Sequence, residues 1–213
     1  MRNWDSLIAL EAGMVGEKTR RDLTALLQEN EAISESIGKC IDSILNMVTR
    51  SENLDKGIVE VVRVNEAQRE WEATFSVVNM GANPIVRLIC EGYYLQAICL
   101  VRQELEGIAQ FKHILSNSRT TKKAPNINHM DEQLRLLYND LSEGAHIASH
   151  AAASIQSPVP IGTEPIIALL PYGSSLIPIY SREFASSVIK IHNQLRQELL
   201  VHLKEHVNEI LSL

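Results

Sequence analysis

Apolar residues recur at steps of three and four positions over most of this 213-residue chain, which is the pattern of amphipathic α-helices. Between Asn83 and Leu115 the pattern is different, because apolar residues fall on all sides of the expected helix. Asn83 can cap its first turn, Pro84 suits the first helical position, and no other proline follows before Leu115. A helix that is apolar on all sides is one enclosed by other helices. We therefore predict an all-α bundle of roughly five or six helices around a buried central helix at about 84–115.

The other amphipathic stretches are expected to surround this central helix in a single domain that spans residues 1–213. Gly13 and Gly16 are predicted to end the first helix and Gly81 the third, whereas Ser181 is predicted to cap the last. The proline-rich apolar segment 157–180 is expected to pack over the bundle as an irregular connection. The predicted surrounding helices cover residues 3–12, 17–50, 55–80, 130–154 and 182–211.

The composition is that of a soluble globular protein, with 45% hydrophobic and 22% charged residues. The formal net charge of −6 disfavours a protein that holds nucleic acid mainly through its phosphates, and basic residues cluster only at Arg119, Lys122 and Lys123. The three cysteines lack the C-x-x-C spacing of metal and redox sites, so we interpret them as small core residues in a reducing cytoplasm. The N-terminal stretch is unlike a signal peptide, and prolines interrupt the apolar stretch from Ile161 to Tyr180, so we expect no membrane contact.

A polar stripe near the middle of the chain is the strongest candidate for chemistry. Tyr138, Ser142, His146 and His150 follow one another every four residues, so a helix places them on a single face. That face points away from the apolar side of the same helix, so the histidines are not simple core residues. The stripe could line a polar cleft in which His146 acts as a general base or ligand beside Ser142. The alternative is a solvated face or a seam between subunits.

The predicted central helix carries a charged pair within its apolar surround. Arg87 and Glu91 lie one turn apart, and Arg102 falls on the same narrow strip. Charges in such a place need partners, because an unpaired buried charge is costly. We expect Arg87 and Glu91 to be mostly buried and paired, or bonded to Tyr138 or Ser142 on the neighbouring helix.

The R-x-x-x-E motif of Arg87 and Glu91, followed by the Y-x-x-L-S-x-x-x-H motif that begins at Tyr138, resembles a group of uncharacterised bacterial all-helical proteins. That group is similar, more distantly, to the HEPN superfamily of helical bundles, many of which are dimeric ribonucleases of toxin and antiviral systems. The resemblance covers about a third of the chain, from Pro84 to Ala152. It implies a dimeric protein of a bacterial defence or toxin–antitoxin system that acts on RNA.

HEPN nucleases carry an arginine and a histidine separated by about four to six residues at the dimer face. This chain has one such match, from Arg196 to His202. The resemblance implies a metal-independent ribonuclease in which Arg196 steadies the phosphate and His202 assists attack by the 2′-hydroxyl. The residue after the arginine is Gln197, where these nucleases usually have asparagine.

Two other functions fit the sequence. The spacing of His146 and His150, and of His202 and His206, directs two imidazoles from one helix at one ion. A mononuclear metal enzyme that uses His146 and His150 with a third ligand such as His113 is therefore an alternative. A di-iron bundle needs Glu-x-x-His twice, whereas the chain has it once, and we expect no cofactor and no tightly bound transition metal. Long helices, few aromatic residues and an apolar late segment also fit a non-enzymatic, oligomerising interaction protein.

Overall fold

The structure, a computed structural model, describes residues 4–50, 60–61, 66–117 and 180–211, and a few residues between 132 and 178. Its helices are α1 (Trp4–Asp22), α2 (Thr24–Val48), α3 (Glu66–Cys90), α4 (Tyr94–Asn117) and α7 (Arg182–Leu211). Two short strands, β1 (Thr49–Arg50) and β2 (Glu60–Val61), pair in antiparallel fashion after α2. The prediction of an all-α bundle is therefore confirmed.

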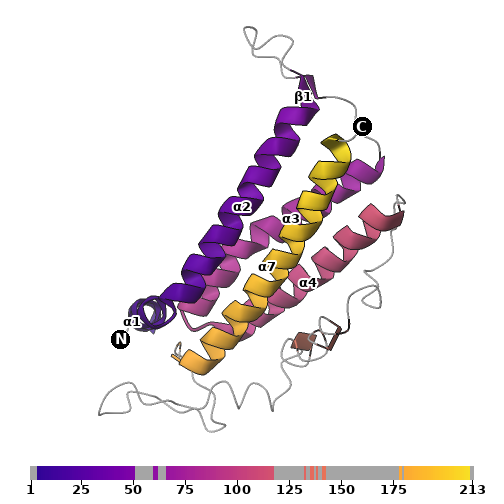
Figure 1. Cartoon of the computed structure of the whole chain (residues 1–213). Helices are drawn as coiled ribbons and strands as arrows, with labels where there is room; N and C mark the ends of the chain where they lie inside the picture. Colours follow the sequence, from indigo (N-terminus) through magenta and orange to yellow (C-terminus); the bar gives the residue numbers. More distant parts are fainter. Residues whose placement is uncertain are drawn as a thin grey trace.

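Helices α2, α3, α4 and α7 lie lengthwise against one another, and α1 crosses one end of them (Figure 1). The closest helix pairs are α3 with α4 and α2 with α7. Helices α2 and α7 run in the same direction, although they come from opposite ends of the chain (Figure 1). Among the described residues, no helix is both long enough and apolar enough to cross a membrane.

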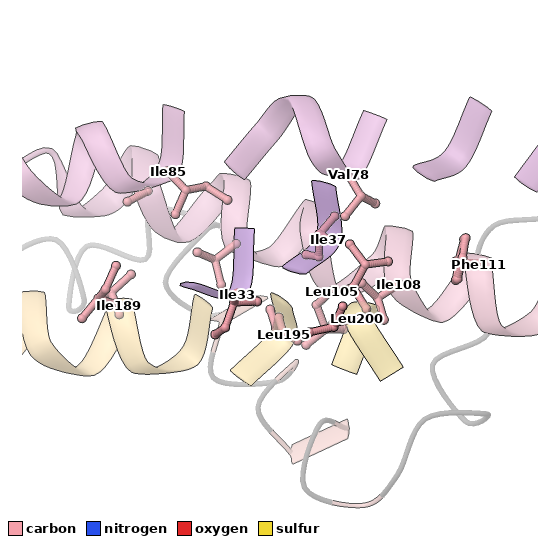
Figure 2. Close-up of a cluster of buried hydrophobic side chains, with 14 of the residues drawn as sticks. Ile33, Ile37, Val78, Ile85, Leu105, Ile108, Phe111, Ile189, Leu195 and Leu200 are labelled. Atoms are coloured by element: carbon pink, nitrogen blue, oxygen red, sulfur yellow. The ribbon is translucent and has the colours of Figure 1, made fainter. Parts of the chain in front are cut away.

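The core is a continuous layer of aliphatic side chains between these helices, with a group of aromatic rings at one end. Figure 2 shows Ile85 and Val78 of α3, Ile37 of α2, and Leu105 and Ile108 of α4 among the residues that converge there. At the aromatic end, the ring of Trp71 lies 5.9 Å from that of Phe75 and 5.2 Å from that of Phe111, measured between ring centroids. Burial of these side chains is the main source of stability for a bundle of this kind.

The predicted single helix at 84–115 is wrong, because the chain reverses at Gly92. This glycine has a φ of 81°, which lies in the left-handed region. The amide of Gly92 donates to the carbonyl of Ile89 at 3.3 Å and that of Tyr93 to the carbonyl of Leu88 at 2.8 Å, the two bonds of a Schellman C-cap. Helix α3 therefore ends at Cys90 and α4 begins at Tyr94. Apolar residues fall on all sides of the stretch because it supplies two antiparallel helices whose buried faces differ.

Glycines that were expected to end helices lie inside them instead. Helix α1 continues through Gly13 and Gly16, and α3 continues through Gly81 and past Pro84. Packing against neighbouring helices outweighs the low helix propensity of these residues. Pro84 is on the exposed side of α3, where water can bond the carbonyl that its missing N–H leaves unpaired. The predicted boundary between the first two helices therefore moves to Leu23.

The last helix matches its prediction. Helix α7 covers Arg182–Leu211, and the hydroxyl of Ser181 accepts a bond from the amide of Phe184 at 3.3 Å. Of the connection at 157–180, Pro178 and Tyr180 are described, and both are buried. The other residues of this connection, and most of the predicted helix at 130–154, lie outside the described residues.

Tyr180 links the segment that precedes α7 to helix α1. Its hydroxyl donates to a carboxylate oxygen of Asp22 at 2.5 Å, and the ammonium of Lys18 lies 4.3 Å from the centre of its ring. Burial and then the bond to Asp22 raise the pKa of Tyr180 to about 12. The same bond lowers the pKa of Asp22. Beside it, the hydroxyl of Tyr94 accepts from the amide of Ser181 at 3.0 Å.

The close approach of α3 and α4 predicts opposite effects for two glycine-to-alanine substitutions. A Cβ at Gly107 would overlap the Cγ2 methyl group of Val78, whereas a Cβ at Gly81 would meet no atom within 4 Å among the described residues. We expect Gly107→Ala to lower the free energy of unfolding by about 1–3 kcal/mol through overpacking. Gly81→Ala should raise it by about 0.5–1 kcal/mol, because alanine favours the helix. Urea unfolding of the two variants measures both; equal effects would contradict the packing of α3 on α4.

The Tyr180–Asp22 contact predicts a loss of stability in alkali. A folded-state pKa of about 12 lies above the value of about 10 for an unfolded tyrosine, so folding favours the protonated phenol. The contribution of the phenol is present in full below about pH 10 and declines as the pH rises towards 12. The difference in unfolding free energy between the wild type and Tyr180→Phe should therefore shrink over that range. A difference that stays constant from pH 8 to pH 12 would rule out the raised pKa.

Candidate functional site

A layer of polar side chains crosses the core where α3, α4 and α7 meet. The Nδ1–H of His192 donates to Oε2 of Glu104 at 2.6 Å, and both side chains are almost completely buried, at 0% and 1% exposed. One turn further along α7, Nη2 of Arg196 donates to Oδ1 of Asn79 at 2.9 Å. Arg196 is itself 2% exposed. We call Asn79, Glu104, His192 and Arg196 the buried polar layer.

The charges of this layer are balanced across the helices. Burial lowers the pKa of Arg196, while the negative charge of Glu104 acts in the opposite direction and favours the charged guanidinium. A buried arginine without a carboxylate nearby would be very costly, so the two residues depend on each other. Among the described residues, several polar atoms of the layer have no hydrogen-bond partner: Oε1 of Glu104, Nε2 of His192, and Nε and Nη1 of Arg196.

In chemical terms the layer combines a histidine oriented by a carboxylate with a neighbouring arginine. Such a group could hold a proton at Nε2 of His192 and an anion at Arg196 if a substrate could reach it. Glu104, His192 and Arg196 are, however, at most 3% exposed. The arrangement therefore acts within the protein, as an interaction that fixes how α4 and α7 pack.

Arg196, the arginine of the predicted nuclease motif, lies in the core of the bundle. It lies on the same side of α7 as the fully buried Leu199 and Leu203, and its guanidinium points at α3. Sequence reasoning missed Glu104 and His192. A signal was present, because Glu104 lies three positions after Val101 and four before Ile108 and so falls on the apolar side of its helix, where charged residues are rarely buried without a partner.

A second polar cluster lies near the surface, between α4 and Tyr138. Arg102 donates from Nε to Oε1 of Glu106 at 3.2 Å and from Nη2 to the hydroxyl of Tyr138 at 3.0 Å. That hydroxyl in turn donates to Oε1 of Glu106 at 3.2 Å. The bond to Tyr138 is the main cause of the raised pKa of Arg102. Tyr138 thus faces an arginine–glutamate pair one turn apart, as expected, but the pair belongs to α4.

The pair expected at this place, Arg87 and Glu91, is at the end of α3 instead. Nε of Arg87 donates to Oε1 of Glu91 at 2.8 Å, so the predicted pairing is confirmed. The predicted burial is wrong, because the side chain of Arg87 is 76% exposed. The bond to Glu91 raises the pKa of Arg87. Arg87 lies two positions from both Ile85 and Ile89, which are fully buried, so it is on the opposite, outer side of α3.

The remaining residues of the polar stripe are described only in part. Ser142 is half-buried, and its hydroxyl oxygen has no hydrogen-bond partner among the described residues. His146 and His150 lie outside the described residues. Their predicted roles as general base or metal ligands therefore stay predictions.

Arg196 and His202 do not share a site within this chain. Six residues along a helix correspond to about 120° of rotation, so the two side chains face different surroundings. The ring of His202 lies between two carboxylates, with Nε2 3.1 Å from Glu198 and Nδ1 3.3 Å from Glu205. His206, its partner in the expected metal pair, packs its ring 4.7 Å from that of Trp71. Among the described residues, no three potential ligands come together around a metal position.

The comparisons with known proteins do not extend this picture. No model of a known protein family matches the chain, and no similar protein was found among curated proteins or among solved structures. The function must therefore be inferred from the geometry of the site and from the surface of the bundle.

Arg196 belongs to the buried polar layer and Arg87 does not. We therefore expect substitutions of these two arginines to differ in their effect on stability. Arg196→Met keeps the length of the side chain but leaves Glu104 and His192 without a balancing charge, so we expect a loss on the order of 3 kcal/mol in the free energy of unfolding. Arg87→Met, at the exposed end of α3, should leave the melting temperature almost unchanged. Thermal and urea unfolding of both variants provide the measurement. If Arg196→Met were as stable as the wild type, the layer would not hold the helices together.

Proposed function

We propose that this chain is a non-enzymatic interaction protein, a helical scaffold that works by binding another protein. The observation that carries the proposal is the enclosure of Arg196. The arginine of the predicted nuclease motif is 2% exposed and bonds Asn79 of the same chain. Its guanidinium takes part in the packing of the bundle. A nuclease of the expected kind would need this group at the surface where two subunits meet.

The surroundings of His202 support the same conclusion. Two carboxylates, Glu198 and Glu205, flank its ring, and they would repel the phosphate of an RNA substrate. The formal net charge of −6 acts in the same direction over longer distances. Both effects disfavour the ribonuclease alternative for this pair of residues.

The resemblance to HEPN proteins concerns the biological setting as well as the chemistry. A role in a bacterial defence or toxin–antitoxin system, a cytoplasmic location and a dimeric state stay predictions. In such a setting we propose that the chain acts by association. Its polar residues then determine how the helices pack and which surface they present.

The ribonuclease alternative predicts a toxic activity that depends on His202. We expect cells that express the wild type and cells that express His202→Ala to grow equally well and to keep intact ribosomal and messenger RNA. Purified wild-type protein should also leave a labelled single-stranded RNA uncut over hours. The control is an equal level of folded protein for both variants, checked by circular dichroism.

A growth defect with RNA cleavage that disappears in His202→Ala would contradict the proposal. It would return the catalytic role to Arg196 and His202. It would also require that α7 repacks in the active form, because Arg196 is buried in the structure described above.

A further inference from the structure

A groove follows the seam between the parallel helices α2 and α7. Two neighbouring hollows of about 370 Å³ and 450 Å³ lie along it. Most of the α7 residues that line them recur at steps of four and three, and so do most of the α2 residues, so one stripe of each helix forms most of the walls. The stripe of α7 consists of Lys190, Gln194, Gln197, Val201, Lys204 and Asn208. The stripe of α2 consists of Glu29, Ile33, Ser36, Cys40 and Ser43.

The shape of this α2–α7 groove suits a third helix. Stripes with three- and four-residue steps on two neighbouring helices leave a channel into which the ridge of another helix fits. The stripe of α7 spans nineteen residues, or eighteen helical steps, from Lys190 to Asn208. At a rise of about 1.5 Å per residue, that is about 27 Å, or roughly five turns of a bound helix.

Apolar side chains lie between polar ones on the floor of the groove. Val201, which is 41% exposed, and Ile33 line one hollow, and Cys40 and Val207 line the other. The hydroxyls of Ser36 and Ser43 donate to carbonyls of their own helix, at 2.9 Å each, so neither offers a free donor to a partner. A partner must therefore bring apolar side chains to the middle of the groove.

The charged side chains at the rim of the groove favour one kind of partner. Glu29 accepts a bond from Asn193 at 3.0 Å, and Glu198 pairs with Lys112 and His202 of the same chain. Within the described part of the chain, no carboxylate lies at ion-pair distance from Lys39, Lys190 or Lys204, which stand at the two ends of the groove. Glu198 thus has Lys112 beside it, whereas Glu29 keeps its charge. Three lysines against two carboxylates leave the lining of the groove with a surplus of positive charge, and the lysines are available to a partner.

We propose that the α2–α7 groove binds an acidic amphipathic helix of another protein. The partner helix would place apolar residues at i, i+4 and i+7 over Val201 and Ile33, and carboxylates near its ends opposite Lys190 and opposite Lys39 and Lys204. This inference rests on the proposed interaction role and names the chemistry of the partner. It also explains why a protein of net charge −6 keeps three lysines along one seam.

Two other occupants fit less well. A nucleic-acid strand brings a negative charge about every 3.4 Å along its axis, far more than three lysines over such a length can neutralise, and it offers no apolar ridge for the floor. A second copy bound through the same groove would bring the lysine-bearing rims of both copies together.

The test is a selection of helical peptides. A phage library of helix-forming peptides of about 20 residues, randomised on one face, is selected against the full-length wild-type protein. Enriched sequences should be acidic at both ends and carry Leu, Ile or Met at i, i+4 and i+7. A synthetic peptide of the strongest sequence should bind Lys39→Glu/Lys204→Glu at least about tenfold more weakly, because the reversals replace attraction by repulsion at the rim.

The matched control is Arg87→Glu/Arg135→Glu, which makes the same change in net charge at exposed positions away from the groove. It should leave the affinity unchanged. The proposal is overturned if no sequence is enriched, if the enriched sequences are neutral or basic, or if both double variants bind equally well. If the wild type binds a 20-nucleotide RNA and Lys39→Glu/Lys204→Glu does not, the groove is an RNA-binding site instead.

Light scattering of the purified wild type tests the remaining possibility, that a second copy of the chain occupies the groove. A dimer that Lys39→Glu/Lys204→Glu dissociates would assign the groove to a second copy and overturn the proposal. If the selection enriches no peptide and RNA stays intact in the His202 assay, the groove inference is wrong but the proposed function is not contradicted. RNA cleavage in that assay would remove the proposed function itself.

Discussion

The left-handed backbone of Gly92 folds the most apolar part of the chain back on itself, and the positions of the other helices follow from that reversal. A residue with a Cβ pays a strain cost at this φ, so the Schellman C-cap depends on glycine. Because α4 then runs antiparallel to α3, Glu104 faces α7 in the core, and Arg102 with Glu106 faces Tyr138 at the surface. Both polar clusters thus exist because the chain turns at one residue.

Much of the architecture could be predicted from the sequence, because amphipathic spacing follows directly from the geometry of the helix. The last helix was predicted with its cap, since Ser181 precedes a long and regular stripe. The break at Gly92 could not be predicted with the same rules. Asn83 and Pro84 form a plausible helix start, and no local pattern distinguishes Gly92 from glycines that lie inside helices, such as Gly13 and Gly81.

The candidate site was predicted less well, and the reason lies in tertiary structure. The rule that an arginine and a glutamate one turn apart need a partner applies equally to Arg87 with Glu91 and to Arg102 with Glu106. Which pair meets Tyr138 depends on where α3 ends, and the error at Gly92 therefore carried over to the site. Likewise, the burial of Arg196 depends on Asn79 and Glu104 from two other helices, which no local pattern around Arg196 reveals.

The parallel arrangement of α2 and α7 has a consequence for how the molecule forms. Asn30 and Asn193, which bond to each other at 2.9 Å, are 163 positions apart in the chain, whereas α3 and α4 are joined by the short turn at Gly92. Local contacts form early, and distant ones wait until their loop-closure entropy has been offset by other contacts. During synthesis the face of α2 that packs on α7 therefore stays uncovered until α7 has left the ribosome. The core between these two helices closes only when α7 arrives.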